Sequence, residues 1–179
     1  MEILIISGLS GSGKSRAATF LEDIGYYIVD NLPAEMMLKF ANFCTASGGR
    51  YDRVALVYDV RAGEPFQRLI DVLDKLRRRD GVRCHMLFLE TDTRVIISRY
   101  KETRRSHPLA RDGRLAEGIR REREALSFLK KQSDYIIDTS ALLTRELRSE
   151  MEKIFVESRE FRNIFVTVLS FGFKNGIPA

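Results

Sequence analysis

Residues 2–15 read EILIISGLSGSGKS, an apolar run followed at once by a glycine-rich loop. The apolar run predicts a buried strand, and the residues from 14 to 23 are predicted to form a helix. The glycine-rich part matches the phosphate-loop pattern, in which two glycines bracket four residues and Lys-Ser follows. Its members are Gly8, Leu9, Ser10, Gly11, Ser12, Gly13, Lys14 and Ser15. A strand, this loop and a helix in that order favour a phosphate-binding loop over a simple tight turn.

The residue types in this loop suit a triphosphate. Glycines allow positive φ angles and close approach of the backbone to a ligand. The amides would converge on a phosphate at the start of the helix, where the helix dipole favours negative charge. Lys14 would then bridge the β- and γ-phosphates, and the Ser15 hydroxyl would bind Mg²⁺.

Strand-like apolar runs and helix-like amphipathic stretches alternate along the chain. Strands are predicted over residues 3–7, 26–30, 53–59, 82–89, 135–138 and 164–169. Helices are predicted over residues 33–46, 65–79, 93–103, 115–131 and 144–158, with Phe66, Leu69, Ile70, Leu73 and Leu76 on one buried helix face. The alternation predicts an α/β protein with the three-layer α/β/α fold of P-loop NTPases, built on a kinase-like, mostly parallel sheet.

Ligands of such sheets bind beyond the carboxyl ends of the strands, which draws attention to two acidic residues. Asp59 ends a run that should form the strand next to the first one, so it is the predicted acid for Mg²⁺ or its waters. Asp30, at the tip of the second strand, could instead face an acceptor hydroxyl in a small-molecule kinase. Either acid could alternatively cap the helix that follows it.

The basic residues are concentrated in one part of the chain. Residues 97–131 hold eleven basic and five acidic side chains, whereas the rest of the chain is about neutral. The segment SRYKETRRSHPL resembles a mobile lid, and we expect at least one of Arg99, Arg104 and Arg105 to reach the nucleotide phosphates. Arg104 and Arg105, with Lys14 and Asp59, are the predicted catalytic residues.

Two other interpretations of the basic segment stay open. It could be a solvated helix of mixed charge, because acidic residues interleave with the arginines. It could also bind RNA, in which case neutralising Arg120, Arg121 and Arg123 should weaken that binding. His107 is predicted to be a loop residue rather than a catalytic base, and His85 a core or edge residue.

The composition predicts one globular domain. The chain has 179 residues, of which 44% are hydrophobic, and no run of membrane-spanning length. With no signal-peptide pattern, the expected location is cytoplasmic. Cys44 and Cys84 lack metal-ligand spacing and are predicted to be reduced core residues. We expect the P-loop domain over residues 1–165, and in residues 166–179 the start of a truncated further domain or a linker strand.

Several segments together resemble one family. They are SGLSGSGKS, LEDIGYYIVDNLP, DVRAGE, LFLETD, RYKETRRSHPL, DYIIDTS and SFGFKNGIP. In this order they are similar to the RNase adapter protein RapZ and its YvcJ-like relatives, a family of P-loop nucleotide-binding proteins. The resemblance covers nearly the whole chain and concerns the N-terminal domain of longer family members.

The resemblance implies binding of ATP and GTP with Mg²⁺ and slow hydrolysis. It places nucleotide-binding segments on the loop from residue 8 to 15 and on Asp59, Val60, Arg61 and Ala62, the latter associated with GTP. Ala62 departs from the polar residue more often expected there. For full-length members the resemblance implies partners in small regulatory RNA and an RNase, and it leaves a homo-oligomer open. No membrane partner is expected.

Overall fold

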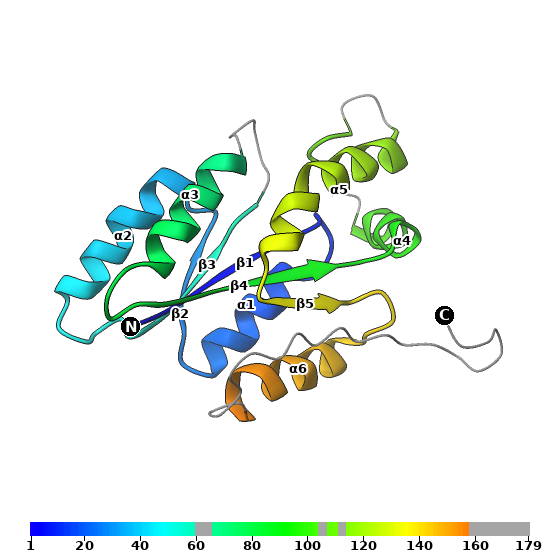
Figure 1. Ribbon diagram of the computed structural model, residues 1–179. Coiled ribbons are helices and arrows are strands. Elements are labelled where there is room, and N and C mark those ends of the chain that lie inside the picture. Colours follow the sequence, from blue (N-terminus) through cyan, green and yellow to red (C-terminus); the bar gives the residue numbers. More distant parts are fainter. Residues whose placement is uncertain (60–65, 104–106, 111–113, 158–179) are drawn as a thin grey trace, which may run out of the picture.

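The computed structural model describes residues 1–59, 66–103, 107–110 and 114–157 (Figure 1). Its elements are β1 (Glu2–Gly8), α1 (Lys14–Asp23), β2 (Tyr27–Asp30), α2 (Ala34–Ala46), β3 (Arg53–Val57), α3 (Phe66–Arg77), β4 (Arg83–Glu90), α4 (Thr93–Thr103), α5 (Leu115–Gln132), β5 (Tyr135–Asp138), α6 (Thr144–Glu152) and the π-helical turn η1 (Lys153–Glu157). The predicted strand at 164–169, the domain boundary near 165, and the predicted site residues Val60, Arg61, Ala62, Arg104 and Arg105 lie outside the described residues.

The five strands form one parallel sheet in the order β2-β3-β1-β4-β5. β1 lies at its centre, with Ile5 paired to Leu56 of β3 and to Met86 of β4. The predicted position of β3 beside β1 is therefore confirmed. The order changes direction at β1, so the loop that leaves β1 opens at the carboxyl edge where ligands of such sheets bind.

Helices cover both faces of the sheet (Figure 1). Ile3 and Ile5 of β1 pack in a cluster with α2, α3 and α5, whereas Leu4 and Ile6 pack on the other face with α1 and α6. Side chains alternate between the two faces of a strand, so the continuous apolar run over residues 3–6 of β1 is what a doubly covered sheet requires. The predicted three-layer α/β architecture is confirmed. Each fully buried apolar side chain stabilises the folded state by about 1.5–3 kcal/mol.

The predicted elements differ from the observed ones mainly at their ends. β3 ends at Val57, so Asp59 lies just past the strand rather than on its last residue. The helix predicted over 144–158 is divided into α6 and the π-helical η1. α3 buries the predicted positions Leu69, Ile70, Leu73 and Leu76. Within the described ranges, no helix is both long and apolar enough to cross a membrane.

Both cysteines are buried, unpaired core residues, as predicted. Burial raises the pKa of the Cys84 thiol to about 12 and also raises the pKa of the Cys44 thiol. Because the thiolate is the reactive form, we expect neither cysteine to react with a thiol reagent at pH 8 in the folded protein. Both should react in denaturant. Fast labelling of the native protein, followed by mass spectrometry, would contradict this.

Candidate nucleotide site

The glycine-rich loop connects the central strand to α1 and takes backbone conformations that glycine permits. Gly8 has φ 144° and lies so close to β4 that a Cβ atom there would be 2.3 Å from the Leu89 carbonyl oxygen. Gly13 has φ 106° and stands immediately before α1. Both angles lie in the region that side-chain-bearing residues rarely adopt. The glycines at these positions therefore fix the course of the loop.

Several polar groups of the loop have no partner within the part of the chain that the structure describes. Among the described residues, the main-chain amides of Gly11, Gly13, Lys14 and Ser15 meet no hydrogen-bond acceptor. The Ser12 hydroxyl is fully buried and also has no partner there. Amides at the first turn of a helix carry partial positive charge and bind anions. The loop is thus a set of adjacent donors with the chemistry of a phosphate site.

Lys14 brings a cation to this loop. Its ammonium group donates to the carbonyl oxygens of Gly8 (2.8 Å) and Leu9 (3.1 Å). It also lies 3.6 Å from an oxygen of the Asp59 carboxylate. The side chain is 9% exposed, so its charge is held at the carboxyl edge of the sheet with little solvent around it. The structure therefore brings together two residues that the sequence placed in one site.

A divalent cation would find oxygen ligands here. Mg²⁺ prefers oxygen and is commonly held by one or two protein groups together with the phosphates of its nucleotide. Ser15 is exposed in the first turn of α1, next in sequence to Lys14, and Asp59 faces Lys14. The described residues contain no cluster of three or more His, Cys, Asp or Glu side chains that could bind a metal alone. The Ser15 hydroxyl and the Asp59 carboxylate are oxygen donors, and in number and chemistry they fit a metal carried by a nucleotide.

Asp30 lies at the same edge of the sheet. It ends β2, pairs in register with Val57 of β3 and is exposed. The next helix, α2, begins after Pro33, and no side chain caps it. Asp30 therefore does not cap α2, and its exposed carboxylate lies at the edge of the sheet that carries the loop.

Arg99 contacts the loop from outside. Its guanidinium group donates to the carbonyl oxygens of Gly11 (2.9 Å) and Thr139 (3.0 Å). The Thr139 hydroxyl donates in turn to the carbonyl oxygen of Ser12 (2.8 Å) and shares a hydrogen bond with Thr91. These contacts hold two loop carbonyls and tie the ends of β4 and β5 to the loop.

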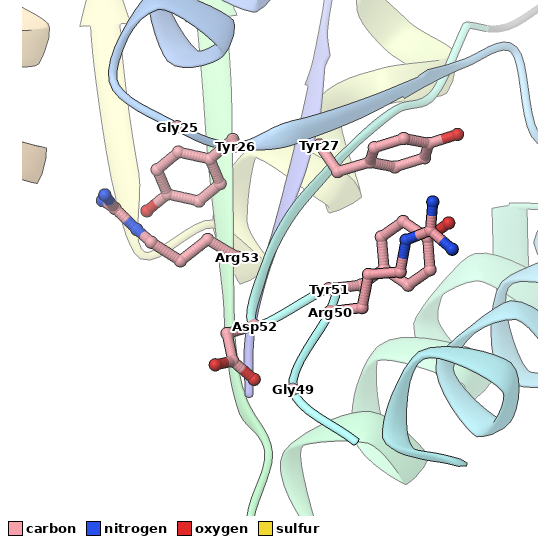
Figure 2. A pocket seen from close by; sticks show the side chains of 8 residues that line it. All are labelled: Gly25, Tyr26, Tyr27, Gly49, Arg50, Tyr51, Asp52 and Arg53. Atoms are coloured by element: carbon pink, nitrogen blue, oxygen red, sulfur yellow. The ribbon is translucent and has the colours of Figure 1, made fainter. Parts of the chain in front are cut away.

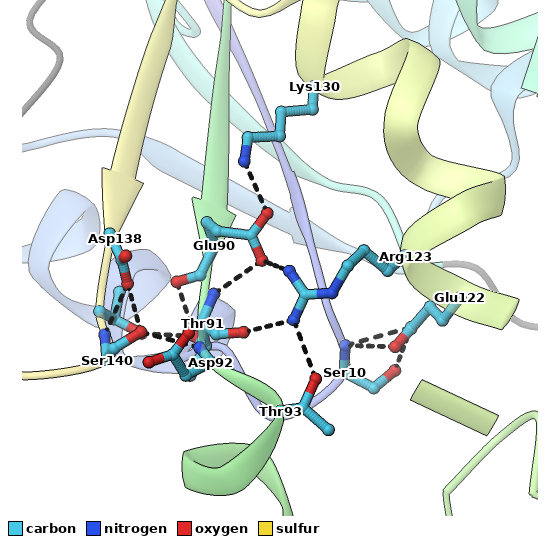
Figure 3. Close-up of polar contacts among 11 residues, drawn as sticks. Ser10, Glu90, Thr91, Asp92, Thr93, Glu122, Arg123, Lys130, Asp138 and Ser140 are labelled. Carbon is cyan, nitrogen blue, oxygen red and sulfur yellow. Dashed lines mark hydrogen bonds and ion pairs between the residues drawn. The ribbon is translucent and has the colours of Figure 1, made fainter. Parts of the chain in front are cut away.

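Glu122 was not predicted as a site residue, yet it also binds the loop (Figure 3). It is completely buried on α5 and accepts hydrogen bonds from the amide and the hydroxyl of Ser10. His107 lies in the loop before α5, as predicted, and it is buried against the same carboxylate. The sequence did carry a signal, because Glu122 lies on the apolar face of α5 with Ile119, Leu126 and Leu129. A carboxylate buried on such a face is unfavourable unless it is hydrogen-bonded.

The arginines proposed for RNA binding are paired with acids. Arg120 and Arg121 bind Glu117 on the surface of α5, and this lowers the Glu117 pKa to about 2, chiefly through the Arg120 hydrogen bond. Arg123 is half-buried, binds Glu90 and donates to the carbonyl oxygen of Thr91 (2.7 Å; Figure 3). It therefore holds the turn after β4.

A separate hollow of about 550 Å³ lies at the amino ends of the strands (Figure 2). Its lining residues are Gly25, Tyr26, Tyr27, Gly49, Arg50, Tyr51, Asp52 and Arg53. The Arg53 guanidinium lies 4.2 Å from the centre of the Tyr26 ring. Burial and a hydrogen bond to Glu2 raise the Tyr26 pKa. The hollow flanks the first residues of β2 and β3, whereas the loop lies at their opposite ends.

Comparisons with known proteins show the family of this chain. The model of the RapZ-like N-terminal domain matches residues 1–159. The chain belongs to the RapZ-like N-terminal domain family. A nucleotide-binding protein of Acetivibrio thermocellus is 51% identical to this RapZ-like domain over 99% of the chain, and one of Ruminiclostridium cellulolyticum is 48% identical. The chain spans 61% of the length of each of these relatives.

Solved structures show that the RapZ-like domain has a kinase-like fold. Shikimate kinase from Acinetobacter baumannii, in complex with shikimate, aligns with a TM-score of 0.60, covering 89% of this chain and 95% of its own. The YorR protein of Bacillus subtilis, in complex with phosphorylated GDP, aligns with a TM-score of 0.54 over 85% of this chain and 94% of its own. Identities of 15% and 16% limit these likenesses to the fold.

Proposed function

We propose that this RapZ-like domain binds ATP or GTP as a magnesium complex and hydrolyses it slowly. The observation that carries the proposal is a set of loop donors that meet no acceptor within the described part of the chain: the amides of Gly11, Gly13, Lys14 and Ser15 and the buried Ser12 hydroxyl. Anionic phosphate oxygens are the acceptors that such amides and a neighbouring ammonium group bind best. The names of the relatives, nucleotide-binding proteins, support the same ligand class.

In this proposal each residue has a defined role. The Lys14 ammonium, now bound to loop carbonyls, would bind the β- and γ-phosphates and balance the charge that develops during phosphoryl transfer. Ser15 and Asp59 would hold Mg²⁺, which when bound neutralises phosphate charge. Water would attack the γ-phosphorus as the bond to the β-phosphate oxygen breaks, and a nucleoside diphosphate and phosphate would leave. The sequence supplies no obvious water-orienting group, so slow turnover is expected.

Isothermal calorimetry with ATP, GTP and the corresponding diphosphates tests this proposal directly, together with an assay for released phosphate. Binding of either triphosphate in the presence of Mg²⁺, with slow release of phosphate, supports it. Absence of binding at millimolar nucleotide would refute it. Comparison of ATP with GTP decides the base preference, to which Asp59, Val60, Arg61 and Ala62 are proposed to contribute.

Changes at the proposed metal ligands should lower nucleotide affinity only when Mg²⁺ is present. Asp59→Asn should lower Mg-ATP affinity about tenfold, because a neutral amide is a weaker ligand for Mg²⁺. In EDTA the variant and the wild type should bind ATP within about twofold of each other. Ser15→Ala should show the same pattern. Equal losses with and without Mg²⁺ would remove Asp59 from the metal site and leave it as the ionic partner of Lys14.

A small-molecule kinase is the second candidate. The exposed Asp30 carboxylate at the carboxyl edge of the sheet is placed as a base toward an acceptor hydroxyl would be, and a fold neighbour binds shikimate. Nucleotide loss measured with and without a panel of hydroxylated metabolites separates the two candidates. A phosphorylated product and strong stimulation by one acceptor, both lost in Asp30→Asn, would establish the kinase.

The regulatory role implied by the resemblance, with small RNA and an RNase as partners, is proposed only for a longer protein. The chain spans 61% of the curated relatives, and the α5 arginines offered for RNA binding are engaged with acids. Arg120 and Arg121 are the residues to neutralise in an RNA-binding test, because their pairs are on the surface. Arg123 is unsuitable, since its loss would disturb the turn after β4.

A further inference from the structure

The buried Glu122 carboxylate accepts hydrogen bonds at both of its oxygens, and several of them come from the loop. The Ser10 amide lies 3.1 Å from one carboxylate oxygen and 3.0 Å from the other, and the Ser10 hydroxyl donates to the first at 2.6 Å. His107 Nε2 lies 3.1 Å from the second oxygen. Both oxygens therefore face donors, so the buried charge is fully hydrogen-bonded.

The tautomer of His107 follows from its other neighbour. The Leu109 amide donates to His107 Nδ1 at 3.2 Å, so Nδ1 acts as the acceptor. A neutral imidazole then carries its proton on Nε2, from which it donates to Glu122. Leu109, His107, Glu122 and Ser10 thus form one chain of hydrogen-bonded groups, in which the Glu122 carboxylate accepts from His107 on one side and from Ser10 of the loop on the other.

Only a carboxylate completes this chain. Glutamine at position 122 offers one acceptor oxygen, and its NH₂ group would face either the Ser10 amide or the Nε2 proton of His107. In either orientation of the amide, two N–H groups would face each other in the protein interior, with no acceptor between them. A merely space-filling residue would not need two acceptor oxygens at this point.

We propose that Glu122 is a positioning residue for nucleotide binding, oriented by His107. It directs the Ser10 amide away from the ligand side of the loop, while Arg99 and Thr139 hold the carbonyls of Gly11 and Ser12. Three consecutive loop residues are thereby fixed from outside, and the following amides remain available for phosphate. A loop ordered before binding loses less conformational freedom when the ligand arrives, which raises affinity. This inference rests on the proposed nucleotide binding.

The test compares Glu122→Gln with Glu124→Gln, which changes an exposed acid on the same helix. Glu122→Gln should lower the affinity for Mg-ATP, Mg-GTP and tripolyphosphate by about the same factor, tenfold or more. This is the size of effect expected when a buried donor loses its acceptor. Glu124→Gln should bind like the wild type. The ¹⁵N signals of His107 should report the Nε2–H tautomer in the wild type and lose that signature in Glu122→Gln.

Ser10→Ala provides the second measurement, because it removes one donor and leaves the amide. It should weaken binding about threefold alone and have no further effect in the Glu122→Gln background, since the two changes act on one interaction. If Glu122→Gln does not fold, Ser10→Ala alone decides. Unchanged affinity in the folded variants overturns the inference and leaves nucleotide binding intact. Absence of wild-type binding would instead refute the proposed function itself.

Discussion

Lys14→Ala is expected to lower the affinity for Mg-ATP and Mg-GTP about 100-fold, or about 3 kcal/mol. The proposed site places one ammonium group against a chain of phosphate charges, in a position where the side chain is 9% exposed and screening is weak. Hydrogen bonds to charged groups in such a setting contribute about 1.5–3 kcal/mol each. Calorimetric titration at constant ionic strength measures the change.

Lys39→Ala is the matched control, since Lys39 is exposed on α2 and the net charge changes equally. It should bind nucleotide as the wild type does. Circular dichroism should show that Lys14→Ala retains its secondary structure, because the sheet and its two clusters of buried side chains do not include Lys14. Wild-type affinity in a folded Lys14→Ala would reject the loop as the nucleotide site.

Gly8→Ala should have the largest effect on stability, lowering the free energy of unfolding by about 3 kcal/mol or more. The new methyl group would lie 2.3 Å from the Leu89 carbonyl oxygen, and that oxygen belongs to a buried strand that cannot move without disturbing the sheet. A φ of 144° adds strain for any residue with a side chain. Urea denaturation followed by circular dichroism measures the loss.

Gly81→Ala separates the clash from the backbone strain. Gly81 also has a positive φ, 74°, but a Cβ atom there would meet nothing within 4 Å. Its replacement should cost only about 1–2 kcal/mol. Equal losses at the two positions would show that strain alone matters and that β1 and β4 can separate around Gly8.

Local pattern was enough to predict much of the fold. The apolar run before Gly8 predicted β1, and the phosphate-loop pattern after it predicted the start of α1. The alternation of apolar runs with helices predicted a parallel sheet, and the fold class that it indicates placed β3 beside β1. The spacing of apolar residues predicted the buried face of α3. These features depend on neighbours in sequence, which is why periodicity and glycine chemistry reveal them.

The contacts that hold the loop could not be predicted in the same way. Arg99 is one of three arginines expected to reach nucleotide phosphates, and that expectation stays a prediction. Its contacts with the Gly11 and Thr139 carbonyls could not be predicted, because the sequence does not show which acceptors a guanidinium group will meet. Arg123 looked like part of a basic surface, yet it binds Glu90. The hydrogen-bond partners of these arginines depend on where α4 and α5 pack at the carboxyl edge. That placement follows from packing over the whole sheet.

The anchors of the loop come from late parts of the chain. Ser10 is separated from Glu122 by 112 positions, Ser12 from Thr139 by 127 and Gly11 from Arg99 by 88. Closing such long spans is entropically unfavourable and slow compared with forming local turns. A nascent chain that has exposed only its first strands would thus hold the motif without its binding geometry. A growing chain would then bind its ligand only after β5 has been synthesised and these tertiary contacts have formed.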